Sequence, residues 1–307
     1  AAPAGEKMGL IGTPVVVQCE EIVAEVPSYF MDPVRACPAT TLYESAQVHG
    51  VLERVDDVDA KAAVLQALMG RFQPEGGHAP IARSEPRFDE LYASAVRGIL
   101  IAGVSLQNLD GKSKLAQNKT PAEVALLCEK LWQRGAPGDV RAVDRIVHAN
   151  RARPDFVLPA FLRAPLGFAA HGHLDDDDGS CADAAASLLH DAYWNEGVSR
   201  EEIARAHRSS SAWVGITDDR DGALVASARA LADGAKWGTI YDVIVRPDVR
   251  ARGLGRCVVQ LILDHPAVRS CRKIHLRTRD AQGLYARFGF VERAPSLNTE
   301  MTRTLVL

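Results

Sequence analysis

The stretch RPDVRARGLGRC, from Arg246 to Cys257, places arginines and closely spaced glycines directly before an apolar run that predicts a helix. Glycines let a ligand approach the backbone closely because no side chain stands in the way. The N–H groups at the start of a helix attract anions, and arginines add charge-assisted hydrogen bonds to phosphate oxygens. The segment from Arg250 to Arg256 therefore predicts a pyrophosphate site, and a glycine-containing turn with solvated arginines is the alternative.

The glycine spacing excludes two common phosphate-binding motifs, because the chain has neither GxxxxGK followed by Ser or Thr nor GxGxxG. The loop instead follows the predicted strand GTIYDVIV and precedes a helix that ends near Asp264. A second motif, DAQGLYARFGF, follows the predicted strand KIHLRT. Antiparallel strands followed by strand, helix, strand and helix indicate a mixed sheet flanked by helices.

Both motifs resemble those of the GNAT family of N-acetyltransferases. The family pattern Arg/Gln-x-x-Gly-x-Gly/Ala is met by Arg250, Gly253 and Gly255, with Pro247 three residues before Arg250. The segment DAQGLYARFGF matches the family's A…LY…FGF segment. The resemblance covers about residues 180–307 and implies acetyl-CoA as the cosubstrate.

The resemblance also implies roles for individual residues, because in this family an amine attacks the thioester carbonyl directly. Tyr285 stands where the family has its general acid, and packing against Phe288 and Phe290 is the alternative role. A phenol can protonate the departing thiolate, since its pKa of about 10 is not far above the thiol's of about 8.5. The residues implied to bind acetyl-CoA are Val243, Ile244 and Val245 in the strand, Arg250, Ala251, Arg252, Gly253, Leu254, Gly255 and Arg256 in the loop, and Thr278.

The general base is expected on the strand before the loop. Asp242 lies within the apolar run TIYDVIV, where an unpaired carboxylate would be costly, so a functional role is expected for it. That role is either proton abstraction or binding of the substrate ammonium. Tyr241 with a chain of waters is the competing base, and His275 is interpreted as a packed or surface histidine.

The first half of the chain carries a different resemblance. The segments AGEKM, YESAQVHGVLERVDDVDAKAAVLQALMGRFQPEGG and LDGKSKLAQNK look like flavin-binding split-barrel proteins, which include pyridoxamine-phosphate-oxidase-like proteins and nitroimidazole-resistance reductases. The resemblance implies FMN as a cofactor, with Lys7, Lys112, Lys114 and Gln117 near its phosphate, and a homodimer formed through this domain. A solvated basic rim is the alternative for the lysines. That family's first strands would precede Ala1, and the chain starts without Met, so we expect an N-terminal stretch to be missing.

The predicted fold class is α+β with two domains: a split β-barrel with helices over residues 1–165 and the GNAT mixed sheet over 181–307. The acidic stretch at 166–180 is interpreted as a linker; a metal site from His171, His173 and the run Asp175–Asp178 is the alternative. We expect strands at 14–19, 22–26, 42–56 and 97–109, the last ended by an Asp-Gly turn, and helices at 57–70, 120–135 and 139–151. Further helices start at Ser180 and Ser199, and strands such as FVERA and MTRTLVL close the chain.

Composition limits the classes of function. The formal net charge is −3, without the basic excess typical of nucleic-acid binding. No apolar stretch approaches the roughly 18 residues that a membrane span needs. The cysteines lack CxxC or zinc-type spacing and indicate reduced thiols in a cytoplasmic protein.

Two hypotheses of function follow from these features. The first is an acetyl-CoA-dependent N-acetyltransferase acting on a small-molecule or peptide amine, fused to a flavin domain that would itself carry an oxidoreductase activity. The second is a sensor or regulator that binds flavin or acyl-CoA without efficient turnover. No metal is expected in the site.

Overall fold

The computed structural model describes residues 9–175 and 179–292. The described residues within Ala1–Ile22 and Tyr43–Ser113 form one compact unit, and those within Val23–Leu42 and Lys114–Leu307 form the second. The two units therefore interleave along the sequence. That residues 1–165 and 181–307 fold as separate domains stays a prediction.

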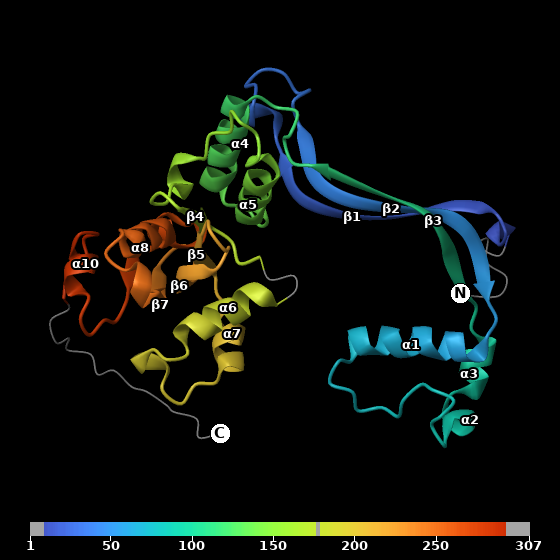
Figure 1. Ribbon diagram of the computed structural model, residues 1–307. Helices are drawn as coiled ribbons and strands as arrows, with labels where there is room; N and C mark the ends of the chain where they lie inside the picture. The colour runs from blue at the N-terminus through green and yellow to red at the C-terminus, as the bar shows by residue number, and fades with distance from the viewer. Residues whose placement is uncertain (1–8, 176–178, 293–307) are drawn as a thin grey trace. The chain divides into compact units, whose positions relative to one another are not determined.

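Three long strands form a sheet in the order β1-β2-β3, and helices follow β2 (Figure 1). The strands are β1 (Pro14–Val26), β2 (Thr40–Val55) and β3 (Ile101–Lys114), and the helices are α1 (Val58–Phe72), α2 (Phe88–Leu91) and α3 (Ala93–Gly98). A small core of Ala62, Ile81, Phe88, Ala93 and Val96 holds the helices together. The described part of the sheet is open, so the predicted split barrel is not confirmed.

Several local predictions in this region were wrong. The two short strands expected at 14–19 and 22–26 are the single strand β1, and β3 continues through Asp110 and Gly111, where a turn was predicted. Cross-strand pairing overrides the local turn preference there. The segment 93–98, at the expected start of that strand, is helix α3. Asp57 does cap α1, accepting a hydrogen bond from the N–H of Ala60 over 2.8 Å.

The second unit contains a five-stranded sheet in the order β4-β5-β6-β7-β8. Neighbouring strands are antiparallel except β7 and β8, which are parallel. The strands are β4 (Phe168–His171), β5 (Ala212–Asp218), β6 (Leu224–Ala232), β7 (Trp237–Val245) and β8 (Lys273–His275). β4 lies within the segment predicted to be a linker, so that part of the linker prediction was wrong: FAAH is too short to show a strand period but pairs with β5.

Helices cover both faces of this sheet. The longer ones are α4 (Pro121–Arg134), α5 (Asp139–Asn150), α6 (Ser180–Leu189), α7 (Arg200–Arg208) and α8 (Leu254–Asp264). The short ones are α9 (Pro266–Arg269), α10 (Gln282–Ala286) and the 3-10 turns η2 (Ser28–Phe30), η3 (Ala160–Leu162), η4 (Tyr193–Asn195) and η5 (Pro247–Val249). α8 packs on the alanines of β6, whereas α6 and α7 form a separate apolar cluster with Ile244 (Figure 1).

Capping boxes start two of these helices, as the sequence predicts. Thr120 and Glu123 bond reciprocally at the start of α4, and Ser199 and Glu202 do so at the start of α7. α4 ends at Gly135 in the left-handed conformation, with φ 61°, which glycine adopts without strain. The predicted closing strand MTRTLVL and the last two residues of FVERA lie outside the described residues. Phe290, Val291 and Glu292 of FVERA are described and are not in a strand, so that part of the prediction was wrong. No helix of the described chain has the length and apolar character that a membrane span requires.

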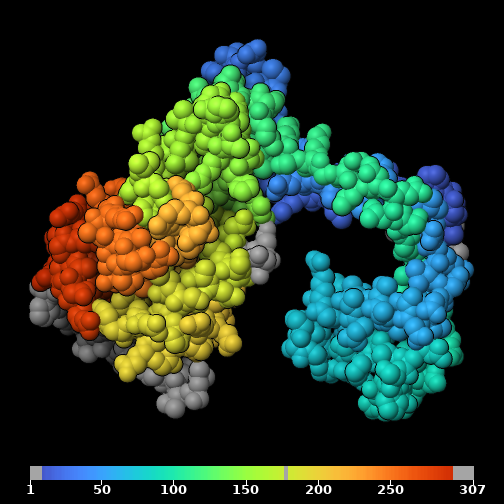
Figure 2. Space-filling model, in the orientation of Figure 1, coloured from blue at the N-terminus to red at the C-terminus, as the bar shows by residue number. Residues whose placement is uncertain are grey.

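Trp132 anchors α4 in the core of the second unit. Its ring stacks on Phe161 at a centroid distance of 4.5 Å, and its Nε1 donates to Asp264 Oδ2 over 2.8 Å. Arg269 donates to the carbonyl oxygens of Trp132 and Gln133 at 2.8 and 2.7 Å. Residues before the predicted boundary therefore share one core with α8 and α9, and in Figure 2 the green, yellow, orange and red side chains form one continuous mass.

Replacing Trp132 tests whether α4 stabilises the sheet unit. Trp132→Ala removes the stacking and the bond to Asp264 and leaves a cavity, so the free energy of unfolding should fall by about 3–5 kcal/mol. Urea denaturation followed by circular dichroism measures the change. Leu126→Ala on the same helix is the control, because that side chain is 37% exposed. Equal effects of the two substitutions would contradict a shared core.

Candidate active site at the open edge of β7

Strand β7 carries a bulge in the middle of the sheet. Ser227 pairs with Ile244 and Arg229 pairs with Tyr241, so β7 has one more residue than β6 between these pairs. The extra length falls at Asp242, whose φ of 55° is left-handed and uncommon for a residue other than glycine. A bulge turns the strand locally and ends regular pairing.

The edge of β7 that faces β8 is open beyond the bulge. β7 and β8 pair only from Trp237 with Lys273 to Thr239 with His275. Within the described residues, β8 offers no partner to Tyr241–Val245. Val243, Ile244 and Val245 therefore lie on a strand end that has backbone groups free for a ligand, except that the carbonyl oxygen of Val245 accepts a bond from Arg250 Nε over 3.2 Å.

The arginine–glycine loop follows directly and forms the start of α8. Gly253 is the N-cap of α8 with φ 85°, and Ala251 is also left-handed with φ 62°. Among the described residues, none accepts a hydrogen bond from the N–H groups of Ala251, Arg252, Gly253, Leu254, Gly255 or Arg256, whereas Cys257 N–H bonds to Gly253 O. The loop therefore presents unbonded donors at the positive end of a helix, which is suited to an anion.

Neighbouring segments hold this loop in place. Arg246 forms an ion pair with Asp248 over 2.7 Å, and the guanidinium of Arg252 lies 5.9 Å from the ring centre of Phe168. Gly255 lies close to β7 and α10, because a Cβ there would lie 3.7 Å from both Val245 Cγ2 and Leu284 Cδ2. The start of α8, the end of β7 and helix α10 thus meet at one point.

Tyr285 lies on α10 and is 7% exposed. Its ring packs against Phe290 in an edge-to-face arrangement with centroids 5.9 Å apart. Burial, with smaller contributions from Tyr193 and Asp280, raises the pKa of Tyr285 to about 12, so the phenol keeps its proton at neutral pH. Thr278 Oγ1 accepts the N–H of Ala281 over 3.1 Å just before this helix. The arrangement is compatible with both predicted roles of Tyr285, as acid and as packing residue.

Asp242, the predicted base, is engaged by other side chains. Its Oδ1 accepts a hydrogen bond from Trp194 Nε1 over 3.0 Å, and its Oδ2 accepts one from Arg229 Nε over 2.5 Å. The competing Tyr241 is 40% exposed and lies under the Arg229 guanidinium, 4.9 Å from it. His275 stacks on the Trp237 ring with centroids 5.1 Å apart.

Sequence reasoning missed Arg229 and Trp194 as partners of Asp242. Arg229 is the one charged residue of the otherwise small and apolar strand LVASARALA, and Asp242 is the one charged residue of the neighbouring strand. Opposite charges in adjacent apolar strands are a signal for a buried ion pair. Trp194, from the short turn η4, has no comparable signal.

The residues predicted to contact FMN make other interactions. Lys112 Nζ lies 5.9 Å from the ring centre of Tyr43, Lys114 Nζ bonds to Thr40 Oγ1, and the side-chain oxygen of Gln117 accepts the N–H of Leu115 over 2.7 Å. Lys7 lies outside the described residues. These contacts give no support to flavin binding, which stays a prediction, as does the homodimer.

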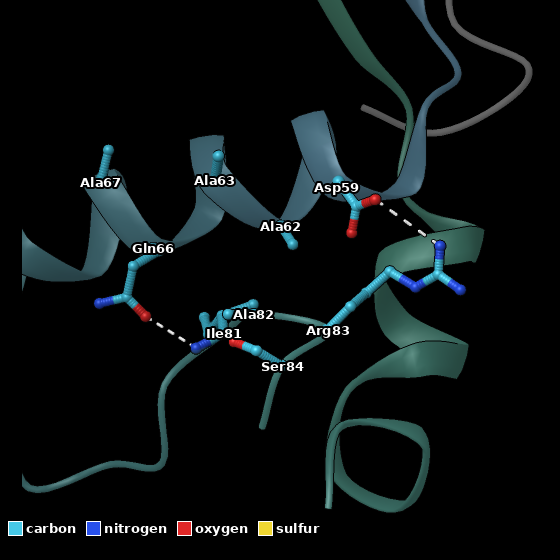
Figure 3. Close-up of a pocket in the computed structure, with 9 residues that line it drawn as sticks. All are labelled: Asp59, Ala62, Ala63, Gln66, Ala67, Ile81, Ala82, Arg83 and Ser84. Atoms are coloured by element: carbon cyan, nitrogen blue, oxygen red, sulfur yellow. Dashed lines mark hydrogen bonds and ion pairs between the residues drawn. The ribbon is translucent and has the colours of Figure 1, made fainter. Parts of the chain in front are cut away.

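A groove lies between α1 and the segment Ile81–Ser84 in the first unit (Figure 3). Its polar groups satisfy one another: Gln66 Oε1 accepts Ile81 N–H over 2.7 Å, and Arg83 pairs with Asp59 at 3.6 Å. Alanines form much of the rest of the wall.

The alternative metal site has no counterpart in residues 9–175 and 179–292, where no three His, Cys, Asp or Glu side chains are grouped to hold a metal ion. His171 Nε2 hydrogen-bonds Thr217 Oγ1 over 2.9 Å, and the N–H of His173 donates to Asp144 over 2.9 Å. The residues Asp176–Asp178 lie outside the described residues.

Comparisons with known proteins agree with this geometry. Residues 162–290 match the model of the acetyltransferase (GNAT) family. Glucosamine 6-phosphate N-acetyltransferase 1 of Oryza sativa subsp. japonica is 34% identical over 73 residues, which are 24% of this chain and 44% of that protein. The chloroplastic GCN5-related N-acetyltransferase 1 of Arabidopsis thaliana is 33% identical over 91 residues, 29% of this chain and 45% of that protein. The chain thus spans less than half the length of these curated relatives.

A solved structure of a putative acetyltransferase of the GNAT family from Xanthomonas campestris pv. campestris is 31% identical, and the match covers 44% of this chain and 93% of that one, with a TM-score of 0.36. The family match spans the five-stranded sheet, the bulged strand and the arginine–glycine loop. The family match therefore places the likeness to GNAT acetyltransferases in the C-terminal region of this chain, residues 162–290.

Proposed function

We propose that the second unit is an acetyl-CoA-dependent N-acetyltransferase that transfers the acetyl group directly to an amine. The observation that carries this proposal is the meeting of three features at Gly255: the unbonded amides of the loop, the open edge of β7 and the helix of Tyr285. Each feature suits one part of acetyl-CoA or one step of the transfer.

The loop residues fit the pyrophosphate. The N–H groups of Ala251–Arg256 are free to donate, and the exposed side chains of Arg250, Arg252 and Arg256 add positive charge. The open edge of Val243–Val245 would bind the amides of the pantetheine arm in the manner of an added strand. An N–H on this edge would also polarise the thioester carbonyl.

The transfer requires two proton movements. The amine nitrogen forms a bond to the acetyl carbon while the bond from that carbon to sulfur breaks, so the nitrogen must lose a proton and the sulfur must gain one. Tyr285 would supply the proton to sulfur, since it holds its proton at neutral pH. Asp242 is the predicted acceptor of the amine proton, and Tyr241 with water is the alternative.

The identity of a relative suggests which acceptor to test first. One curated relative is named as a glucosamine 6-phosphate N-acetyltransferase, so an amino sugar phosphate leads the list of amines. Other small-molecule amines and peptide amines follow. The competing function is a sensor that binds acyl-CoA without turnover; the buried, protonated Tyr285 beside the loop supports the enzyme instead.

The direct experiment measures free thiol released from acetyl-CoA. The full-length protein is incubated with glucosamine 6-phosphate, a polyamine, an aminoglycoside, free amino acids and a peptide with a free N-terminus. We expect one class to accelerate thiol release and to gain the mass of an acetyl group. Tight acetyl-CoA binding with no acceleration by any class would favour the sensor.

Gly253→Glu tests the pyrophosphate site. The new carboxylate would lie among the free amides and repel the phosphates, so the Kd for acetyl-CoA should rise at least tenfold, or about 1.4 kcal/mol. Isothermal titration calorimetry measures it. Gly234→Glu is the matched control, because Gly234 is also left-handed with φ 70° and has no atom within 4 Å of an added Cβ. Equal affinities in the two variants would remove the loop from the site.

Tyr285→Phe tests the acid role. The ring and its contact with Phe290 are kept, so stability and acetyl-CoA affinity should hardly change, whereas kcat should fall roughly 10²–10⁴-fold because thiolate protonation is lost. Single-turnover kinetics measure the chemical step. In the wild type, the phenol stays protonated below its raised pKa of about 12, so activity loss from its deprotonation should begin near that pH and not near 10. A variant with the wild-type rate would leave Tyr285 as a packing residue.

A further inference from the structure

The Asp242 carboxylate connects three separate segments at the bulge of β7. Oδ1 accepts the indole N–H of Trp194 in η4 over 3.0 Å, and Oδ2 accepts Arg229 Nε from β6. The side chain of Asp242 is 9% exposed. Both oxygens therefore have donors already, and a substrate amine would have to displace Trp194 or share Oδ1 with it.

The charges around Asp242 are balanced by Arg229. The guanidinium also lies over Tyr241, and its NH1 is 3.5 Å from Ser210 Oγ on the other side. His207 of α7 is fully buried with its Nε2 3.8 Å from Asp242 Oδ2, and burial lowers the pKa of His207 to about 4, so this ring is neutral. Arg229 is thus the cation that allows the carboxylate to stay buried.

Trp194 and its neighbour Tyr193 link the bulge to the segment that precedes α10. The ring of Trp194 meets that of Tyr193 edge to face with centroids 4.9 Å apart, and the guanidinium of Arg279 lies 3.7 Å from the centre of the Tyr193 ring. The turn η4 therefore contacts the bulge through Trp194 and the segment just before α10 through Tyr193 and Arg279.

We propose that Asp242 is a positioning residue: through its bond to Trp194 it holds η4 against the segment that leads into α10, and η4 forms the wall against which the acceptor amine is placed. The placing of an acceptor amine rests on the proposed function. The contact between Asp242 and η4 does not depend on it. The role differs from that of a base because Asp242 would act without touching the transferred proton.

Hydrogen–deuterium exchange tests the contact without any turnover. The N–H of Asn195 bonds to Ala192 O and that of Val198 bonds to Asn195 O, so both report on the order of η4. Trp194→Phe removes the donor, and Asp242→Asn keeps a residue that tolerates the left-handed backbone while weakening the bond to Arg229. Both variants should exchange these two amides at least tenfold faster than the wild type, with unchanged exchange in α8.

Trp237→Phe is the matched control, because it removes another half-exposed indole from β7 and leaves the partners of Asp242 in place. Wild-type exchange in η4 for both Trp194→Phe and Asp242→Asn would overturn the proposal, whether or not the protein acetylates an amine. Faster exchange in a protein that acetylates none of the tested amines would support the contact and count against the proposed function.

Kinetics then separate positioning from base catalysis, using the amine of the panel that is acetylated fastest. Positioning predicts that Trp194→Phe and Asp242→Asn each raise the amine KM about tenfold. The amine KM of the double variant should be no higher than that of either single variant. The Kd for acetyl-CoA should change less than twofold. Base catalysis predicts a normal Trp194→Phe enzyme and an Asp242→Asn enzyme whose kcat falls roughly 10²–10⁴-fold while its amine KM is unchanged. The second pattern would overturn the proposal.

Discussion

The ion pair between Asp242 and Arg229 is the interaction on which the active-site geometry depends. It lies between two strands that are otherwise apolar, and both side chains are largely buried, at 9% and 14% exposure. Removing one partner of such a pair leaves an unpaired buried charge and typically costs about 3–5 kcal/mol. The pair also holds an aspartate in the left-handed conformation that creates the bulge, so the charge and the backbone shape stabilise each other.

The bulge decides how the sheet can be used. Because β7 turns at Asp242, its pairing with β8 ends at Thr239, and the next residues keep an open edge. The arginine–glycine loop and the start of α8 follow that edge within a few residues. We propose that a long ligand with a charged end and an amide-containing arm binds along this continuous stretch of backbone, which lies within the residues 162–290 that match the GNAT family.

The acetyltransferase sheet does not stand alone in this chain. Helix α4 contributes Trp132 to the core of the sheet unit, where it contacts Phe161, which precedes β4, and Asp264, which lies between β7 and β8 in sequence. The resemblance of the first half to flavin proteins rested on the order of elements and on lysines. In the described residues, Lys112 and Lys114 have other partners and the sheet is open, so the order of elements alone was weak evidence for a flavin site.

The sequence alone determined the features that are local: the capping boxes at Thr120 and Ser199, the glycine that starts α8, and the motif around Tyr285. Each depends on residues only a few positions apart, so spacing reveals it. Tertiary structure decided the rest. Asp242 has its partners 13 and 48 residues away at Arg229 and Trp194, so the pairing of its carboxylate depends on strand register and on the position of η4, which the residues next to Asp242 do not determine. The short strand β4 and the unbroken β3 likewise exist because of hydrogen bonds to distant strands, which override what their own residues favour.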